Sequence, residues 1–100
     1  MPINVENLQG IWKLQTDRPN LISTITFTEH YFSKITVEKN NLTEDCDNGK
    51  MELRNLDNET THIYFHPNMT SNTIVLTNVI LEGDILQFTL NGNNLIYNRQ

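Results

Sequence analysis

Two histidines and a tyrosine occupy alternate positions of one apolar stretch, and they are the residues best suited to acid–base or metal chemistry. His62, Tyr64 and His66 would share one face of a strand, because strand side chains alternate between two faces. His62 and His66 would then lie about 13 Å apart, too far to bind one metal ion. We therefore expect no metal site and no cofactor.

The orientation of this stretch decides what the three side chains can do. Ile63 and Phe65 alternate with them and are better candidates for a buried face, which favours histidines in solvent. In the opposite orientation, His66 or His62 would be the general base of a pocket and Tyr64 its proton donor. A small barrel enzyme, such as a cyclase, isomerase or lyase, is the less favoured alternative.

A second candidate is the polar segment 39–49, which contains Glu44, Asp45, Cys46 and Asp47. Its length and the Asp-Asn-Gly turn signal at its end predict an exposed loop. Its carboxylates lack the spacing of an EF-hand calcium loop, and their charge disfavours a reactive thiolate at Cys46. The single cysteine cannot form an internal disulfide, which fits a reducing compartment.

Composition limits the class of protein and its partners. The chain of 100 residues has no alanine and many threonines and asparagines, which favours one all-β domain. Its net charge is -5 and its seven Lys and Arg residues are scattered, so nucleic acid and anionic membranes are not expected as partners. No apolar run could span a bilayer. The first residues lack a secretory pattern, so we expect a cytoplasmic protein unless a signal was removed.

Alternation and turn signals predict the elements that position these residues. Asn4 can begin a helical turn that ends before Gly10. Eight short strands follow, joined by short turns, and this spacing is typical of a sandwich or an up-and-down barrel. The strands are expected at residues 11–16, 21–29, 31–38, 50–56, 60–66, 73–81, 84–90 and 94–99.

The two ends of the chain carry a family resemblance. The segment Gly10-Ile11-Trp12, preceded by Leu8 and followed by Lys13-Leu14, resembles the opening motif of the lipocalins and fatty-acid-binding proteins, the calycin group. The closing segment 95–99 is similar to the last strand of that group, in which an arginine packs across the tryptophan. The chain lacks the helix and disulfide of typical lipocalins and the helical lid of fatty-acid-binding proteins. It resembles best the short, single-domain lipocalin-like proteins of bacteria.

The resemblance implies an antiparallel eight-stranded up-and-down barrel. In such a barrel the last strand ends where the first begins, so Arg99 should lie beside Trp12, with Gly10 as part of the same structural motif. A guanidinium over an indole contributes about 0.5 to 2 kcal/mol. The loops at the other end, at residues 17–20, 39–49, 67–72 and 91–93, would form the open mouth, where such barrels bind ligands.

Three functions remain open at this point. The favoured one is binding of an apolar or amphipathic small molecule in the interior, by Phe27, Ile35, Val37, Phe65, Leu76, Phe88 and Leu90, with Arg18 and His66 near the mouth. The second is a protein-interaction or inhibitor module that acts through its mouth loops, including the acidic one, or through an exposed strand face. The protein itself is expected to be a monomer or homodimer. The third is the enzyme described above.

Overall fold

The computed structural model describes residues 3–40, 43–57, 59–69 and 71–100. They form α1 (Val5–Leu8), β1 (Gly10–Leu14), β2 (Leu21–Thr28), β3 (Tyr31–Glu38), β4 (Thr43–Asn55), β5 (Thr61–Pro67), β6 (Ile74–Glu82), β7 (Ile85–Leu90) and β8 (Asn93–Arg99). Each strand pairs antiparallel with the next, and β8 pairs with β1 to close a barrel. The predicted all-β, eight-stranded up-and-down barrel with a short N-terminal helical turn is confirmed. No helix in these ranges has the length and apolar character needed to cross a membrane.

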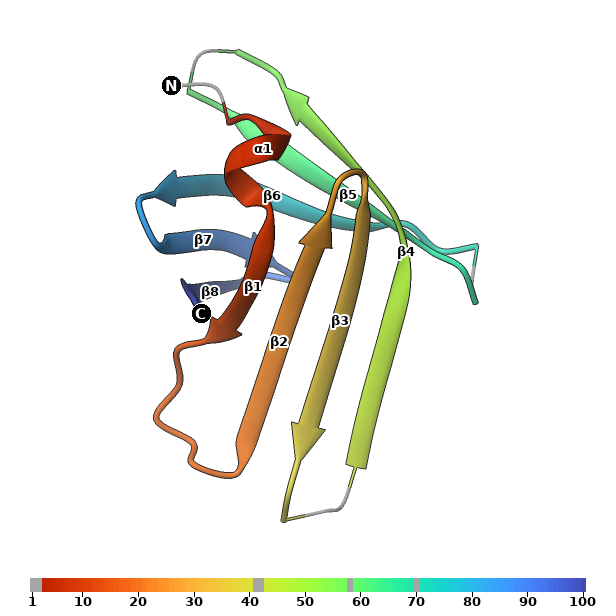
Figure 1. The fold of residues 1–100 in the computed structure, drawn as a ribbon, viewed down its shortest axis with the longest axis vertical. Helices are drawn as coiled ribbons and strands as arrows, with labels where there is room; N and C mark the ends of the chain where they lie inside the picture. Colours follow the sequence, from red (N-terminus) through yellow and green to blue (C-terminus); the bar gives the residue numbers. More distant parts are fainter. Residues whose placement is uncertain (1–2, 41–42, 58, 70) are drawn as a thin grey trace.

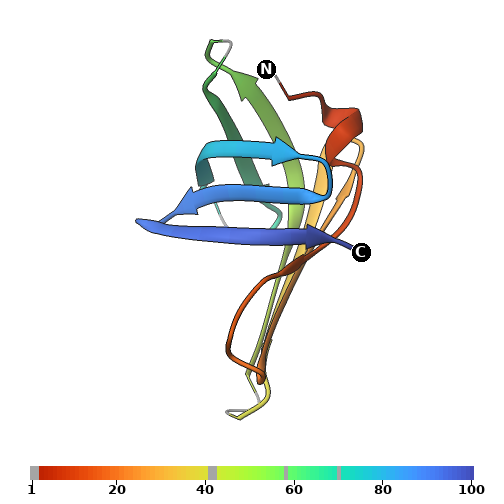
Figure 2. The ribbon, with the colours of Figure 1, turned by 90° about the vertical axis from the view of Figure 1, so that its left-hand side faces the viewer.

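The barrel is flattened, and its walls run in different directions. In Figure 1, β2, β3 and the lower part of β4 run vertically, while β6, β7 and β8 run across the view. Figure 2 shows β6–β8 in front and the ends of β2–β4 projecting below them. The molecule is therefore elongated, with extents of 41 × 30 × 25 Å. The projecting ends lie at the mouth, away from α1.

β4 is longer than expected, and this is the main correction to the fold. Its first part pairs with the whole of β3, from Glu38↔Thr43 to Tyr31↔Lys50. The predicted exposed loop is therefore wrong over residues 43–49, and its residues 41–42 lie outside the described residues. A polar segment can form a strand when a neighbour supplies the hydrogen bonds, because alternate side chains still reach solvent. The other strand ends lie within two residues of the expected bounds.

The middle of the barrel is filled by aromatic side chains. Phe32 stacks on Phe65 with ring centroids 4.0 Å apart, and Phe27 lies 5.9 Å from the same ring. Phe88 stacks on Tyr97 at 5.4 Å. All five belong to one buried apolar cluster. Such filling is typical of small barrels, whose interior is only wide enough for side chains.

Trp12 closes the barrel end next to α1. Its side chain is fully buried, and its indole N–H donates to the backbone oxygen of Leu8 at 2.9 Å. Gly10 precedes it with a φ of 118°, which a residue with a Cβ rarely adopts. A Cβ there would also lie 3.3 Å from Nη1 of Arg99. The backbone angle therefore requires the glycine of the motif, and a Cβ would in addition press on the Arg99 guanidinium.

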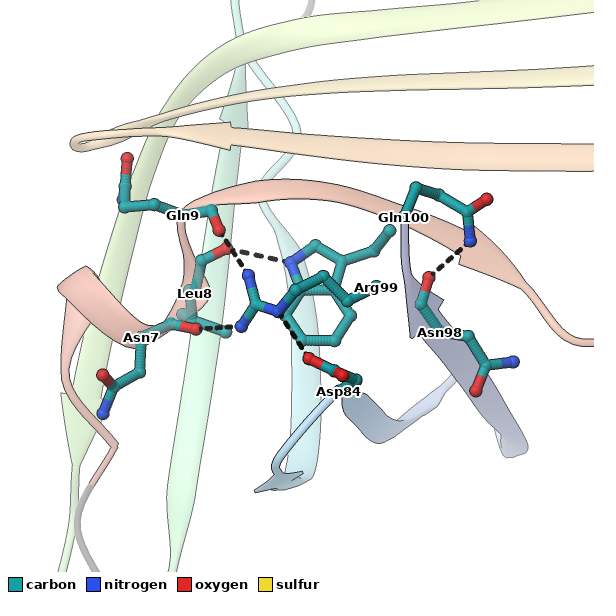
Figure 3. Close-up of polar contacts among 8 residues, drawn as sticks. Asn7, Leu8, Gln9, Asp84, Asn98, Arg99 and Gln100 are labelled. Carbon is teal, nitrogen blue, oxygen red and sulfur yellow. Dashed lines mark hydrogen bonds and ion pairs between the residues drawn. The ribbon is translucent and has the colours of Figure 1, made fainter.

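Arg99 covers the indole of Trp12, as the strand count predicts, with its Cζ 4.2 Å from the ring centre. Its Nη1 donates to the backbone oxygen of Gln9 at 2.6 Å and its Nη2 to that of Asn7 at 2.7 Å (Figure 3). Its Nε donates to the carboxylate of Asp84 at 3.2 Å. One guanidinium thus joins the end of α1, the turn after β6 and the indole, in a forked geometry that lysine cannot reproduce.

Replacing Arg99 by lysine should lower the free energy of unfolding by about 2 kcal/mol, because one ammonium cannot replace three directed hydrogen bonds and a ring contact. Urea denaturation followed by tryptophan fluorescence measures the change. Arg18→Lys is the matched control, since the side chain of Arg18 is 64% exposed and forms one surface ion pair. It should change stability by less than about 0.5 kcal/mol. Equal losses in both variants would contradict the role given to Arg99.

Candidate functional site

Polar side chains line one wall of the barrel at the mouth. Residues paired directly across an antiparallel ladder point to the same face. Ile25 is buried in the interior and pairs with Lys34, and the buried Ser23 pairs with Thr36. Lys34 and Thr36 therefore face inward. Together with Tyr97 of β8, Ser23, Lys34 and Thr36 form what we call the polar mouth.

Tyr97 brings β8 into this group through hydrogen bonds. Its hydroxyl lies 2.9 Å from Ser23 Oγ, which in turn lies 3.1 Å from Thr36 Oγ1. Tyr97 is 1% exposed, and its burial raises the pKa of its phenol above the usual value, against the opposing effect of the Ser23 hydrogen bond. The three hydroxyls satisfy one another, so they form a fixed, neutral part of the mouth.

Lys34 differs from these hydroxyls because its ammonium has no hydrogen-bond or ion-pair partner among the described residues. Burial lowers the pKa of its ammonium, and the charges of Asp47, its cross-strand partner, and Asp45 on β4 partly offset this effect. A half-buried charge without a partner is unfavourable for folding. Its position in the mouth makes it a candidate for contact with a ligand.

The other side of the mouth is apolar. Leu95 pairs with the buried Phe88, and Leu14 pairs with the buried Tyr97, so both leucines face the interior. Leu90 follows Phe88 by two positions and shares its face. All three leucines are partly buried and pack against the core. The mouth therefore combines an apolar wall with a few polar groups, as ligand sites commonly do.

The register corrects the expected inner face of β3. Ile35 and Val37, predicted in the interior, pair with Thr24 and Ile22 on the outer face, and Ile35 is 40% exposed. Phe32 is instead the buried apolar residue of this strand. The predicted alternation is correct, but the predicted inner face is wrong. By hydrophobicity alone, the face with Ile35 and Val37 looks more suitable for the core than the face that carries Phe32 together with a lysine and a threonine.

The remaining predicted lining residues divide between core and rim. Those in the core are each 1% exposed: Phe27, Phe65, Leu76 and Phe88. A side chain beside a cavity large enough for water would keep accessible surface, so these four pack against protein atoms. Leu90 reaches the mouth. Arg18 lies at the rim, where Nη2 contacts Oε1 of Glu38 at 2.5 Å.

The residues predicted for acid–base chemistry lie on the outer face of β5. Ile63 and Phe65 are both buried, at 0% and 1% exposure, and alternate residues of a strand take the opposite face. His62, Tyr64 and His66 therefore point away from the interior. This is the favoured orientation of the two considered, and it separates the histidines from the mouth.

His66 nevertheless has two polar neighbours on this outer face. Its Nδ1 lies 3.4 Å from Oγ1 of Thr73, and its Nε2 lies 3.7 Å from Oε2 of Glu52. Tyr64 lies beneath Arg54, whose Cζ is 4.6 Å from the ring centre. The His66 side chain is 45% exposed. The group resembles a hydroxyl–imidazole–carboxylate series, but solvent reaches it freely, so it lacks the water-excluding surroundings that favour catalysis.

The acidic residues of β4 are spread along a strand. Cys46 pairs with Ile35 on the outer face and is exposed, whereas Asp45 and Asp47 pair with the inward-facing Thr36 and Lys34. Within the described ranges, no group of three or more His, Cys, Asp or Glu side chains is placed to hold a metal ion. The inward carboxylates act on the mouth through their charge.

Replacing Lys34 by methionine should increase stability at about pH 7, because the folded protein holds this proton less firmly than the unfolded chain does. The pKa of Lys34 is lower in the folded protein than its usual value of 10.5. The unfavourable free energy of burying the ammonium is therefore fully present at pH values below the pKa of the folded state, and it disappears as the pH rises toward 10.5. The gain of the variant over wild type should therefore shrink with rising pH. Urea denaturation at several pH values measures it. Lys50→Met, on the exposed outer face, is the control; a similar gain there would contradict this account of Lys34.

Comparisons of the chain with protein-family models, with curated proteins and with solved structures found no match. The eight-stranded antiparallel barrel is consistent with a calycin-like fold. The comparisons assign no family, so what the mouth can bind must be inferred from its own residues.

Proposed function

We propose that this protein is a lipocalin-like binding protein that holds a small amphipathic molecule across its mouth. The apolar part of the ligand lies against Leu14, Leu90 and Leu95, and its polar end lies at Lys34. The observation that carries this proposal is the half-buried, inward-facing ammonium that lacks a partner among the described residues. A ligand oxygen would supply that partner in a charge-assisted hydrogen bond, worth about 1.5 to 3 kcal/mol.

The filled core limits the size of this ligand. The aromatic rings of Phe27, Phe65 and Phe88 occupy the middle of the barrel, so a long chain has no path along the axis. A compact molecule at the mouth fits better than a long acyl chain. The ligand therefore lies at the mouth of the barrel, rather than in the interior where the resemblance placed it.

The charges of the mouth favour particular head groups. A ligand amine would be repelled by the Lys34 ammonium, whereas a carboxylate or hydroxyl oxygen can accept its hydrogen bond. Asp45 and Asp47 reduce the preference for a negative head group, because both lie near enough to Lys34 to affect its charge. We therefore expect a carboxylate and an alcohol to bind better than the matching amine.

The alternative functions have less support from the geometry. The version of a protein-interaction module that uses an acidic loop loses support, because residues 43–49 of that loop are part of β4. An enzyme was expected to use His62, Tyr64 and His66 in a pocket, but these residues lie on the outer face. The mouth combines inward polar groups with apolar neighbours, so a ligand-binding role accounts best for its residues.

Titration with 4-phenylbutyrate, 4-phenylbutanol and 4-phenylbutylamine tests the proposal, because these compounds share one compact apolar part. Calorimetry should show the acid and the alcohol binding more tightly than the amine. Lys34→Met should weaken binding of the acid about tenfold, equivalent to about 1.4 kcal/mol, and remove the discrimination against the amine. Amide chemical-shift changes should centre on Leu14, Leu90 and Leu95.

Lys50→Met is the matched control, since it removes an exposed lysine of the outer face and should leave all three affinities unchanged. Binding that is equal for the three head groups, or equal in wild type and Lys34→Met, would show that Lys34 does not hold the ligand. Absence of binding by all three compounds would count against an amphipathic ligand.

A further inference from the structure

Among the described residues, no strand covers one edge of β4 near the closed end of the barrel. β3 covers β4 as far as Lys50, and the last bond on this side runs from the Met51 N–H to the His30 oxygen at 2.7 Å. β4 continues to Asn55 while paired with β5 on its other side. Figure 1 shows this upper part of β4 extending past the turn between β2 and β3.

The hydrogen-bond alternation shows which backbone groups face the uncovered edge. In an antiparallel pair, alternate residues bond to the neighbouring strand. The Leu56 N–H donates to the Thr60 oxygen, so the even-numbered residues of this part of β4 bond toward β5. The N–H and C=O of Leu53 therefore point to the uncovered side. No hydrogen bond from the described residues reaches them there.

A groove of about 580 Å³ lies along this edge. Its lining is mixed: Ile3, Val5, Met51 and Leu53 contribute apolar surface, and polar residues, among them Asn4 and Asn55, contribute a comparable polar surface. Such a groove beside unpaired backbone groups is the arrangement used in peptide recognition by strand addition.

The groove is bounded at both ends by the protein itself. At one end is the His30 turn described above. At the other, the Ile3 N–H donates to Asn55 Oδ1 at 3.2 Å, and Asn55 Nδ2 donates to the Ile3 oxygen at 3.1 Å. The carboxamide thus pairs with Ile3 much as a strand backbone would. The open length is short, so a flexible segment fits it better than the edge of another folded barrel.

We propose that this edge binds a short extended peptide, which adds antiparallel to β4 and pairs its backbone with Leu53. The peptide residue opposite Leu53 faces the same side of the sheet as Leu53, where Met51 and Ile3 offer apolar contacts, because paired residues point to the same side. Its N–H donates to the Leu53 oxygen, and its C=O accepts from the Leu53 N–H. This interaction is separate from ligand binding at the mouth.

Two charged residues beside Leu53 specify the flanking positions of the peptide. Glu52 and Arg54 pair with Tyr64 and His62 on the outer face. Their side chains form an ion pair with each other, with Arg54 Nε 2.5 Å from Glu52 Oε1, and remain 45% and 54% exposed, so a peptide side chain can still reach each of them. A basic residue opposite Glu52 and an acidic residue opposite Arg54 would complement them. In antiparallel pairing, the peptide therefore reads acidic, apolar, basic from its N-terminus.

Titration with acetyl-Thr-Glu-Val-Lys-Thr-amide, followed by amide chemical shifts, tests this assignment. The Leu53 amide should show the largest change, and saturation is expected on the order of 1 mM for so short a peptide. The charge-reversed peptide acetyl-Thr-Lys-Val-Glu-Thr-amide should bind about threefold more weakly. Methylation of the valine nitrogen in the first peptide should abolish binding, because it removes the donor to Leu53.

Two protein variants distinguish binding at the β4 edge from binding elsewhere on the barrel. The double variant Glu52→Lys with Arg54→Glu should reverse the preference between the two peptides, and circular dichroism checks its fold. Lys34→Met should bind the peptide as wild type does, since it alters only the mouth. Equal binding of the methylated peptide, or changes centred on the mouth, would overturn the proposal. So would a concentration-dependent shift of the Leu53 amide without peptide, which would identify a second copy of the chain as the occupant.

Discussion

Closure of the sheet between β1 and β8 is the constraint on which the rest of the structure depends. The seam is short, with the register pairs Trp12↔Arg99, Lys13↔Asn98 and Leu14↔Tyr97. Side chains strengthen it at both ends: Arg99 covers the indole at the closed end, and Tyr97 reaches Ser23 toward the mouth. Without closure, both strands would expose edges, and the inward residues would lose their shared interior.

The closed barrel divides its interior into parts with different physical character. Around Trp12 and the aromatic rings, burial is nearly complete, and the burial of this apolar surface favours folding. At the mouth, Lys34 is kept partly desolvated although this opposes folding. A residue that lowers stability at such a position is expected where a function such as the proposed ligand binding, rather than stability, favours it.

Local patterns in the sequence are sufficient to predict the barrel but not its site. Alternation and turn signals predict the strands, and the even number of strands places Arg99 beside Trp12. The inner face of β3 is not predicted correctly, because Ile35 and Val37 look more suitable for a core than Lys34 and Thr36, and only the register with β2 decides between them. The uncovered edge at Leu53 escapes prediction for a similar reason, since it depends on where β3 stops relative to β4.

The short seam has a counterpart between β5 and β6, whose described register pairs are also three, whereas β2 and β3 share eight. The three strands β6–β8 therefore share few register pairs with their neighbours, β5 on one side and β1 on the other. Such a unit is suited to open locally as one piece, in the manner of a cooperative subdomain. A ligand held by Lys34 on β3 and by Leu90 and Leu95 on β7 and β8 would join this unit to the rest of the barrel. Because the ligand would bind only the closed barrel, its binding free energy would also oppose the local opening of β6–β8.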